Sequence, residues 1–172
     1  MEQALLVIDM LNDFIQSEGR LYIGESGFEI ISPIQRIIQK AREERTHVIY
    51  ICDRHLPQDA EFEMFPPHCL QETPGAQIID ELTPARGDII IPKRRFSAFF
   101  GTDLDLTLRE LKVNELFLTG VCTNICILYT AADARGLNYK VNVYKNAITS
   151  FSSEAHTYAL KEMENTLGVN IL

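Results

Sequence analysis

Five residues that can carry chemistry stand where apolar runs of the sequence give way to polar residues. Asp9 follows "ALLVI", Asp53 ends "THVIYICD", Lys93 ends "GDIIIPK", and Cys122 and Cys126 lie in "LTGVCTNICILYTAADA". A thiol can attack a carbonyl carbon, a carboxylate can carry the proton, and a lysine can support the thiolate. Brought together, these residue types form a complete covalent hydrolase for an amide.

Either cysteine could be the nucleophile. Both lie where a predicted strand passes into a predicted helix, at 123–136. A thiol near a helix N-terminus meets the positive end of the helix dipole and unpaired N–H groups, which favour the thiolate and can hold an oxyanion. Spacing alone leaves both Cys122 and Cys126 as candidates, the other being a packing residue.

A second group of polar residues lies in the segment "CDRHLPQDAEFEMFPPHCL". It contains two acids and two histidines that could converge on a metal ion if the loop folds back: Asp53, His55, Glu61 and His68. Loop histidines and acids are mostly solvated, so this spacing by itself is a weak indication of a metal. Residues 54–86 are rich in proline and lack a long periodic pattern, which is typical of a functional loop.

The elements that would position these residues alternate between short apolar runs and amphipathic stretches. This alternation predicts an α/β fold with a mostly parallel sheet covered on both faces. The predicted strands are 4–9, 46–53, 87–93, 114–120, 139–147 and 169–172. The predicted helices are 28–45, 103–112, 123–136 and 153–168. Ligands bind at the carboxyl ends of such strands, where the candidate residues fall.

Composition narrows the class of protein. The chain has 172 residues, which predicts a single domain over 1–172, and a net charge of -8, which argues against nucleic acid or anionic membrane as a partner. The N-terminal apolar run stops at Asp9, too short for a leader or a membrane span. We therefore expect a cytoplasmic protein whose four cysteines stay reduced.

Three blocks resemble those of the isochorismatase-like cysteine hydrolases, in the same order: "LLVIDMLNDF", "KRRFSAFFGTDLDLTLRE" and "LTGVCTNICILYTAADARGLNY". The resemblance implies a three-layer αβα fold with a Rossmann-like sheet of about six strands. It also implies Cys126 as nucleophile, Asp9 as base and Lys93 as the supporting lysine. It further implies a cis peptide between Val121 and Cys122, with the backbone N–H groups of Cys122 and Cys126 forming the oxyanion hole.

Within that family, "D-x-H" followed by "PPHC" resembles the nicotinamidases. The resemblance implies a metal held by Asp53, His55 and His68, which would bind the ring nitrogen of the substrate. The sequence departs from the commoner pattern at Glu61, where a third histidine is often found. A carboxylate can still bind Zn²⁺, Mn²⁺ or Fe²⁺, so we predict Glu61 as the fourth ligand and zinc as the ion, with Glu63 as a rival ligand.

The resulting hypothesis is a metal-dependent amidohydrolase that converts nicotinamide to nicotinate and ammonia through a cysteine thioester, in NAD salvage. Phe14 and Phe65 would form walls for the flat ring, and His47 and His156 are interpreted as lying away from the site, His156 as exposed. Alternatives are hydrolysis of a carbamoyl or ureido compound, or a catalytically silent binding scaffold. Isochorismate hydrolysis is disfavoured because it needs no attacking thiol. The family resemblance also suggests a homo-oligomer.

Overall fold

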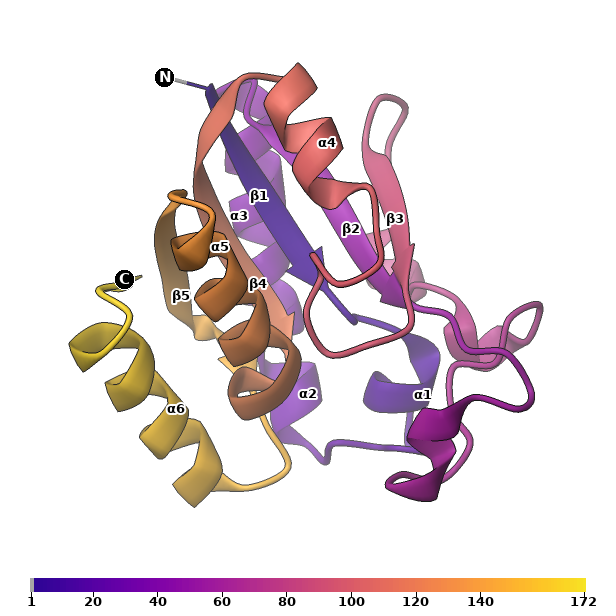
Figure 1. The fold of residues 1–172 in the computed structure, drawn as a ribbon. Coiled ribbons are helices and arrows are strands. Elements are labelled where there is room, and N and C mark those ends of the chain that lie inside the picture. Colours follow the sequence, from indigo (N-terminus) through magenta and orange to yellow (C-terminus); the bar gives the residue numbers. More distant parts are fainter. Residues whose placement is uncertain (1) are drawn as a thin grey trace.

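The computed structural model describes residues 2–172, in which six parallel strands lie between layers of helices (Figure 1). The order across the sheet is β3-β2-β1-β4-β5-β6. The strands are β1 (Glu2–Ile8), β2 (His47–Asp53), β3 (Ile89–Lys93), β4 (Val113–Val121), β5 (Lys140–Thr149) and β6 (Asn170–Ile171). The predicted α/β class and Rossmann-like sheet are confirmed, and every strand pair is parallel.

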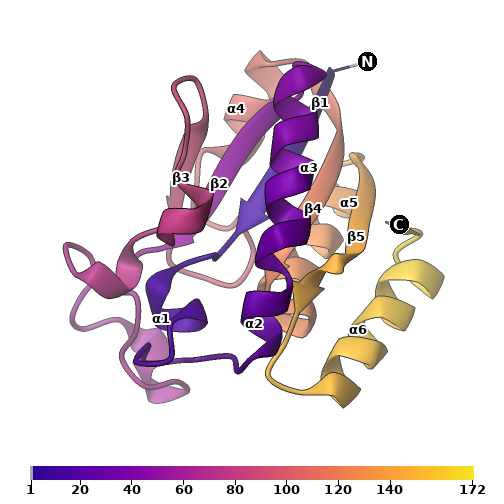
Figure 2. The ribbon, with the colours of Figure 1, turned by 180° about the vertical axis from the view of Figure 1, so that it is seen from behind.

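Helices cover both faces of this sheet. One face is covered by α3 (Ile31–Glu43), and the other by α4 (Leu104–Glu110), α5 (Leu128–Gly136) and α6 (Ser153–Asn165) (Figures 1 and 2). The short helices α1 (Asn12–Ile15) and α2 (Ser26–Glu29) lie towards the carboxyl ends of the strands. In residues 2–172, no helix is long and apolar enough to cross a membrane.

The central strand β1 shows why the apolar runs are unbroken. Ala4, Leu6 and Ile8 point into the core beneath α4, α5 and α6. Leu5 and Val7 point into the core beneath α3. Because successive side chains of a strand alternate faces and both faces are covered from Ala4 to Ile8, every position in this part of the strand is apolar.

The predicted helix 28–45 is two helices in the structure. α2 ends at Glu29 and α3 begins at Ile31, with Pro33 in its first turn. Proline lacks an N–H and is tolerated in a first turn, so a new helix starting just before Pro33 avoids a broken hydrogen bond. The predicted apolar face of Ile31, Ile34, Ile38 and Ala41 is buried, as expected.

The predicted start of one helix and the predicted end of another were also wrong. The predicted helix 123–136 opens with a π-helical turn, Thr123–Ile127, before α5 begins at Leu128. The last helix ends at Asn165, short of the predicted 168, where Gly168 takes a φ of 63° that a helix cannot continue through.

The 54–86 segment is held by three short 3₁₀ helices, Ala60–Glu63, Pro74–Ala76 and Asp80–Leu82.

Gly120, near the carboxyl end of β4, is a position where only glycine fits. Its φ is 108°, and a Cβ built there would lie 1.9 Å from the carbonyl oxygen of Ile8 in β1. We expect Gly120→Ala to cost several kcal/mol of unfolding free energy, because the clash is with backbone and the backbone angle disfavours any side chain. Urea unfolding measures the loss. The control is Gly136→Ala, whose Cβ would meet no atom within 4 Å, and a Gly120→Ala protein as stable as wild type would contradict the expectation.

Candidate active site

Three charged residues from three adjacent strands meet a thiol at the carboxyl edge of the sheet. The Lys93 Nζ lies 2.9 Å from Asp9 Oδ2, 2.5 Å from Asp53 Oδ1 and 3.4 Å from Cys126 Sγ. All four residues are buried, and the polar atoms of Asp9, Asp53 and Cys126 lie within 4.8 Å of one another. The structure thus brings together the residues that the sequence predicted as nucleophile, base and supporting lysine.

Asp9 is held by its backbone as well as its side chain. It has a φ of 53°, in the left-handed region that aspartate tolerates better than most residues. Its N–H donates to the carbonyl of Ile51 (2.9 Å), and its Oδ1 accepts from the N–H of Asp53 (2.9 Å). These two bonds tie the end of β1 to the end of β2, so the carboxylate has a fixed direction.

Burial and mutual charge set the protonation of the carboxylates and the lysine. Burial, with the charge of Asp53, raises the pKa of Asp9 to about 6, although Lys93 opposes the shift. Burial also acts to raise the pKa of Asp53, but the charge of Lys93 and the nearby imidazoles of His55 and His68 outweigh it and lower that pKa below its usual range. Burial would lower the pKa of Lys93, yet the two aspartates raise it well above its ordinary value. Lys93 is therefore a permanent cation, and Asp9 is the group that can exchange a proton near neutral pH.

Burial opposes the thiolate that the helix terminus and Lys93 were expected to favour at Cys126. Burial raises the pKa of the Cys126 thiol well above its ordinary value, and the negative charges of Asp9 and Asp53 add to this although Lys93 opposes it. The sequence identified Lys93 as a nearby cation, but it did not indicate how deeply the Cys126 side chain is buried. A protonated thiol needs a base at hand, which is the place that Asp9 occupies.

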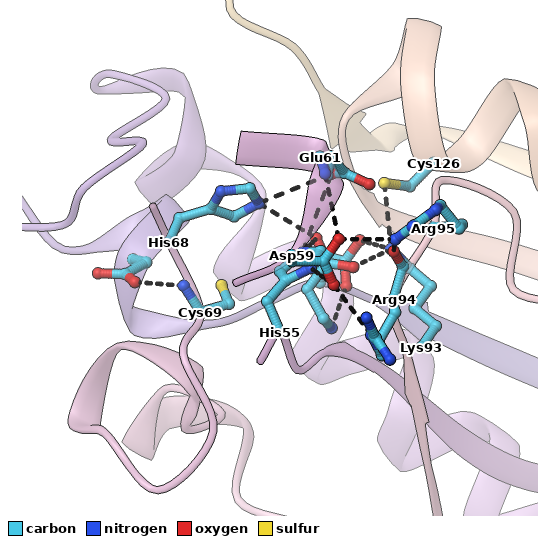
Figure 3. Close-up of polar contacts among 12 residues, drawn as sticks. His55, Asp59, Glu61, His68, Cys69, Lys93, Arg94, Arg95 and Cys126 are labelled. Carbon is cyan, nitrogen blue, oxygen red and sulfur yellow. Dashed lines mark hydrogen bonds and ion pairs between the residues drawn. The ribbon is translucent and has the colours of Figure 1, made fainter. Parts of the chain in front are cut away.

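The chain around the thiol is wound as a π turn. The carbonyl of Cys122 accepts from the N–H groups of Ile125 (3.0 Å) and Ile127 (3.1 Å), the two residues that flank Cys126. The Val121–Cys122 peptide is cis, as the resemblance implied. Turns of this kind are frequent at functional sites. Here the side chain of Cys126 points at Lys93 (Figure 3).

His156 does not lie where the sequence suggested. It is half-buried rather than exposed, and its Nδ1 lies 2.8 Å from the hydroxyl oxygen of Thr123, the first residue of the π turn. The amphipathic pattern of α6 gave no indication of this contact, because it depends on how α6 packs against the turn. The N-terminal end of α6 therefore braces the segment that carries Cys126.

Beside the thiol, Asp53 at the end of β2 and three side chains of the long loop form a group that could hold a metal ion. Asp53, His55, Glu61 and His68 are buried, and one ligand atom of each lies within 4.8 Å of all the others. Asp53 Oδ2 is 3.6 Å from His55 Nε2 and 3.7 Å from His68 Nε2, and Glu61 Oε1 is 3.9 Å and 4.0 Å from the same nitrogens. Glu63, the rival ligand, is exposed to solvent. The structure places Glu61 in this group.

The contacts of this group fit a bound cation. The separations are too long for direct hydrogen bonds but suit atoms arranged around one ion. His55 Nε2 and Glu61 Oε2 are buried with no hydrogen-bond partner in residues 2–172, which is costly for polar atoms. The Nδ1 of His68 lies 2.9 Å from the carbonyl oxygen of Pro66, so this nitrogen donates and leaves Nε2 as a free ligand atom.

An apolar pocket connects the thiol with the metal-ligating group. Its lining includes Asp53, Glu61, His68, Cys122 and Cys126. The remaining walls are apolar: Phe14, Leu21, Phe65, Phe96, Ile125 and Phe151. The rings of Phe14 and Phe65 meet that of His68 edge-on, at centroid distances of 5.6 Å and 6.3 Å. Both predicted aromatic walls therefore border this pocket.

Comparison with known proteins gives the family. The isochorismatase domain matches residues 3–171, nearly the whole chain. This protein belongs to the isochorismatase family.

Solved structures of isochorismatase-family members and similar proteins share the whole fold. The crystal structure of nicotinamidase PncA from Bacillus subtilis has a TM-score of 0.94 and 36% identity, covering 99% of each chain. A pyrazinamidase of Pyrococcus horikoshii, in complex with zinc, has a TM-score of 0.94 and 31% identity over 100% of this chain and 99% of its own. An N-carbamoylsarcosine amidase from Thermoplasma acidophilum has a TM-score of 0.91 and 31% identity over 99% and 95%. This isochorismatase-family chain is thus similar to amidases of more than one kind.

Proposed function

We propose that this protein is a metal-dependent amidohydrolase that converts nicotinamide to nicotinate and ammonia. The observation that carries the proposal is one apolar-walled pocket that is lined both by Cys126 and by three of the four residues that could hold a metal, Asp53, Glu61 and His68. The similarity to nicotinamidase and pyrazinamidase structures supports the same substrate class. The 1–172 chain would act as one catalytic domain.

Asp53, His55, Glu61 and His68 would hold the metal. Two imidazoles and two carboxylates suit Zn²⁺, Mn²⁺ or Fe²⁺, and the zinc complex of the similar pyrazinamidase favours zinc. When bound, the ion supplies a Lewis acid that holds the ring nitrogen of the substrate and fixes the ring in the pocket. Burial and the charge of Asp53 raise the pKa of Glu61, which marks a crowding of negative charge that a cation would relieve.

The thiol step follows from the geometry around Lys93. Asp9 takes the proton of Cys126, whose sulfur attacks the carboxamide carbon while the cationic Lys93, 3.4 Å away, stabilises the thiolate. The backbone N–H groups of Cys122 and Cys126 hold the developing oxyanion. Asp9 then passes its proton to the leaving nitrogen, so that ammonia departs and a thioester remains. Water activated by Asp9 hydrolyses the thioester and restores the thiol.

The pocket lining favours an uncharged aromatic amide over a ureido acid. Ureido and carbamoyl amino acids carry a carboxylate, which a binding site normally meets with an arginine or lysine. Within the described residues, the lining contains neither, and Lys93 beneath it is already paired with Asp9 and Asp53. Aromatic walls at Phe14 and Phe65 suit a flat ring instead.

The test is ammonia release by protein purified without chelator, with nicotinamide and ureidoacrylate as competing substrates. We expect nicotinamide to be hydrolysed faster, and removal of the metal to lower turnover by about 100-fold or more, because substrate positioning is lost. Adding back Zn²⁺, Mn²⁺ or Fe²⁺ should restore it. Faster hydrolysis of ureidoacrylate would refute the substrate, and full activity of the stripped protein would refute the metal. A loaded protein that hydrolyses neither would favour a silent scaffold.

A further inference from the structure

We propose that Asp59, clamped by Arg94 and Arg95, is a positioning residue that aims His55 and Glu61 at the metal. This inference rests on the proposed metal site and adds a second layer of residues around it. None of the three residues borders the pocket that holds the thiol, and the sequence pattern did not single them out.

A single buried carboxylate makes four polar contacts here (Figure 3). Asp59 Oδ1 accepts from the N–H of Glu61 (3.1 Å) and from Arg95 (2.8 Å). Asp59 Oδ2 accepts from Arg94 Nε (2.9 Å) and lies 3.2 Å from His55 Nδ1. Each oxygen thus faces one candidate metal ligand and one guanidinium.

The contact with His55 determines which ring nitrogen is free. A carboxylate beside Nδ1 favours the tautomer with its proton on that nitrogen, which leaves the lone pair of Nε2 for the metal. The 3.2 Å contact is electrostatic rather than a well-aligned hydrogen bond, since Nδ1 has no hydrogen-bond partner in the described chain. His55 is fully buried, so no bulk water competes for this nitrogen.

The contact with Glu61 fixes the position of the second candidate metal ligand. Asp59 is the N-cap of the 3₁₀ helix Ala60–Glu63, and its side chain accepts from the first turn at Glu61. A capping carboxylate fixes where such a turn begins, and with it the direction of the side chains that follow. The same residue therefore governs His55 through its ring and Glu61 through its backbone.

The two arginines anchor this carboxylate to the catalytic strand. Arg94 and Arg95 directly follow Lys93 at the end of β3, and their side chains are 48% and 39% exposed while Asp59 is buried between them. Two guanidinium groups compensate the buried charge and hold it in one place. The metal loop is thereby fixed to the strand that carries Lys93.

The decisive measurement is metal affinity of the folded, metal-stripped protein, by competition for Zn²⁺ or Mn²⁺ with a chromophoric chelator. We expect Asp59→Asn, which keeps the shape but removes the charge, to bind about 10- to 100-fold more weakly than wild type. The matched control is Asp88→Asn. Asp88 pairs with Arg42 at 2.5 Å beside the opposite end of β3, so its loss should leave metal affinity within about twofold.

A second variant guards against misfolding of Asp59→Asn. Arg95→Gln removes one arm of the clamp from a partly exposed position and should weaken metal binding several-fold, whereas Arg86→Gln, on the exposed turn before β3, should not. Nitrogen NMR of ¹⁵N-histidine protein, with four histidines in the chain, should show Nδ1 of His55 protonated in wild type and a mixture of tautomers in Asp59→Asn.

The outcomes separate the two proposals. If wild type binds metal and Asp59→Asn binds it as tightly, with His55 unchanged in the NMR spectrum, the positioning role is overturned and the proposed metal site stands. If wild type itself binds no metal, the metal site is wrong and the positioning role falls with it. A lower melting temperature of Asp59→Asn with unaltered metal affinity would mean that the carboxylate only holds the loop in place.

Discussion

We expect the Cys126→Ala variant to release ammonia from nicotinamide more than about 10⁴-fold more slowly than wild type. The reason is that the Cys126 sulfur lies 3.4 Å from Lys93 Nζ and borders the pocket next to the metal-ligating group, so this is the thiol on which Asp9 and Lys93 are expected to act. The fold should survive, because the substitution removes one sulfur atom from the edge of a pocket. Single-turnover ammonia release and far-UV circular dichroism measure the two effects.

Cys52→Ala is the matched control for this prediction. Cys52 is equally buried, but it points into the core beneath α3, on the opposite face of β2 from Asp53. Its loss should leave turnover within a few-fold of wild type. Mass spectrometry of wild type quenched during turnover should also find a nicotinoyl group on Cys126. An active Cys126→Ala protein would exclude the thioester route.

The second large effect concerns stability. Lys93→Met should lower the unfolding free energy by about 3–5 kcal/mol, because it leaves Asp9 and Asp53 buried side by side without their cation. Methionine fills nearly the same space, so the loss arises from charge and not from a cavity. Urea unfolding of metal-free protein at pH 7 measures it, and catalysis should be lost as well because the thiolate has no counter-charge.

Lys40→Met gives the comparison. Lys40 pairs with Glu44 on the exposed surface of α3 at 3.8 Å, where solvent screens the charges, and its replacement should change the unfolding free energy by less than about 1 kcal/mol. Equal losses for the two variants would show that the buried cluster is not electrostatically coupled in the way its distances indicate.

Much of the fold was predictable from the sequence because the inner strands β1 and β2 are buried on both faces over most of their length. Runs such as "ALLVID" and "THVIYICD" allow no other interpretation once they alternate with amphipathic helices. The boundary errors had local causes: Pro33 separates α2 from α3, and Gly168 follows the early end of α6. Such positions depend on turn geometry that periodicity does not report.

The site was predictable where strand ends alone determine position. Asp9, Asp53 and Lys93 had to meet, because parallel strands present their carboxyl ends at one edge. The contacts made by Asp59, Arg94 and Arg95 were not predictable, since they join a loop to a strand 35 residues away. The burial of Cys126 beside two carboxylates also escaped prediction, because the sequence does not place these groups in space.

The position of β1 has a consequence for the order in which activity is acquired. β1 is made first but lies in the middle of the sheet, where its neighbour β4 pairs with it across 113 positions of sequence, as in the bond from Thr119 to Leu6. Until ribosomal synthesis passes β4, one edge of β1 is open, and base and lysine exist without their thiol. The slow, non-local pairing of β4 with β1 must therefore be complete before the protein can catalyse its reaction. The onset of turnover during refolding thus reports closure of the sheet rather than early collapse of the chain.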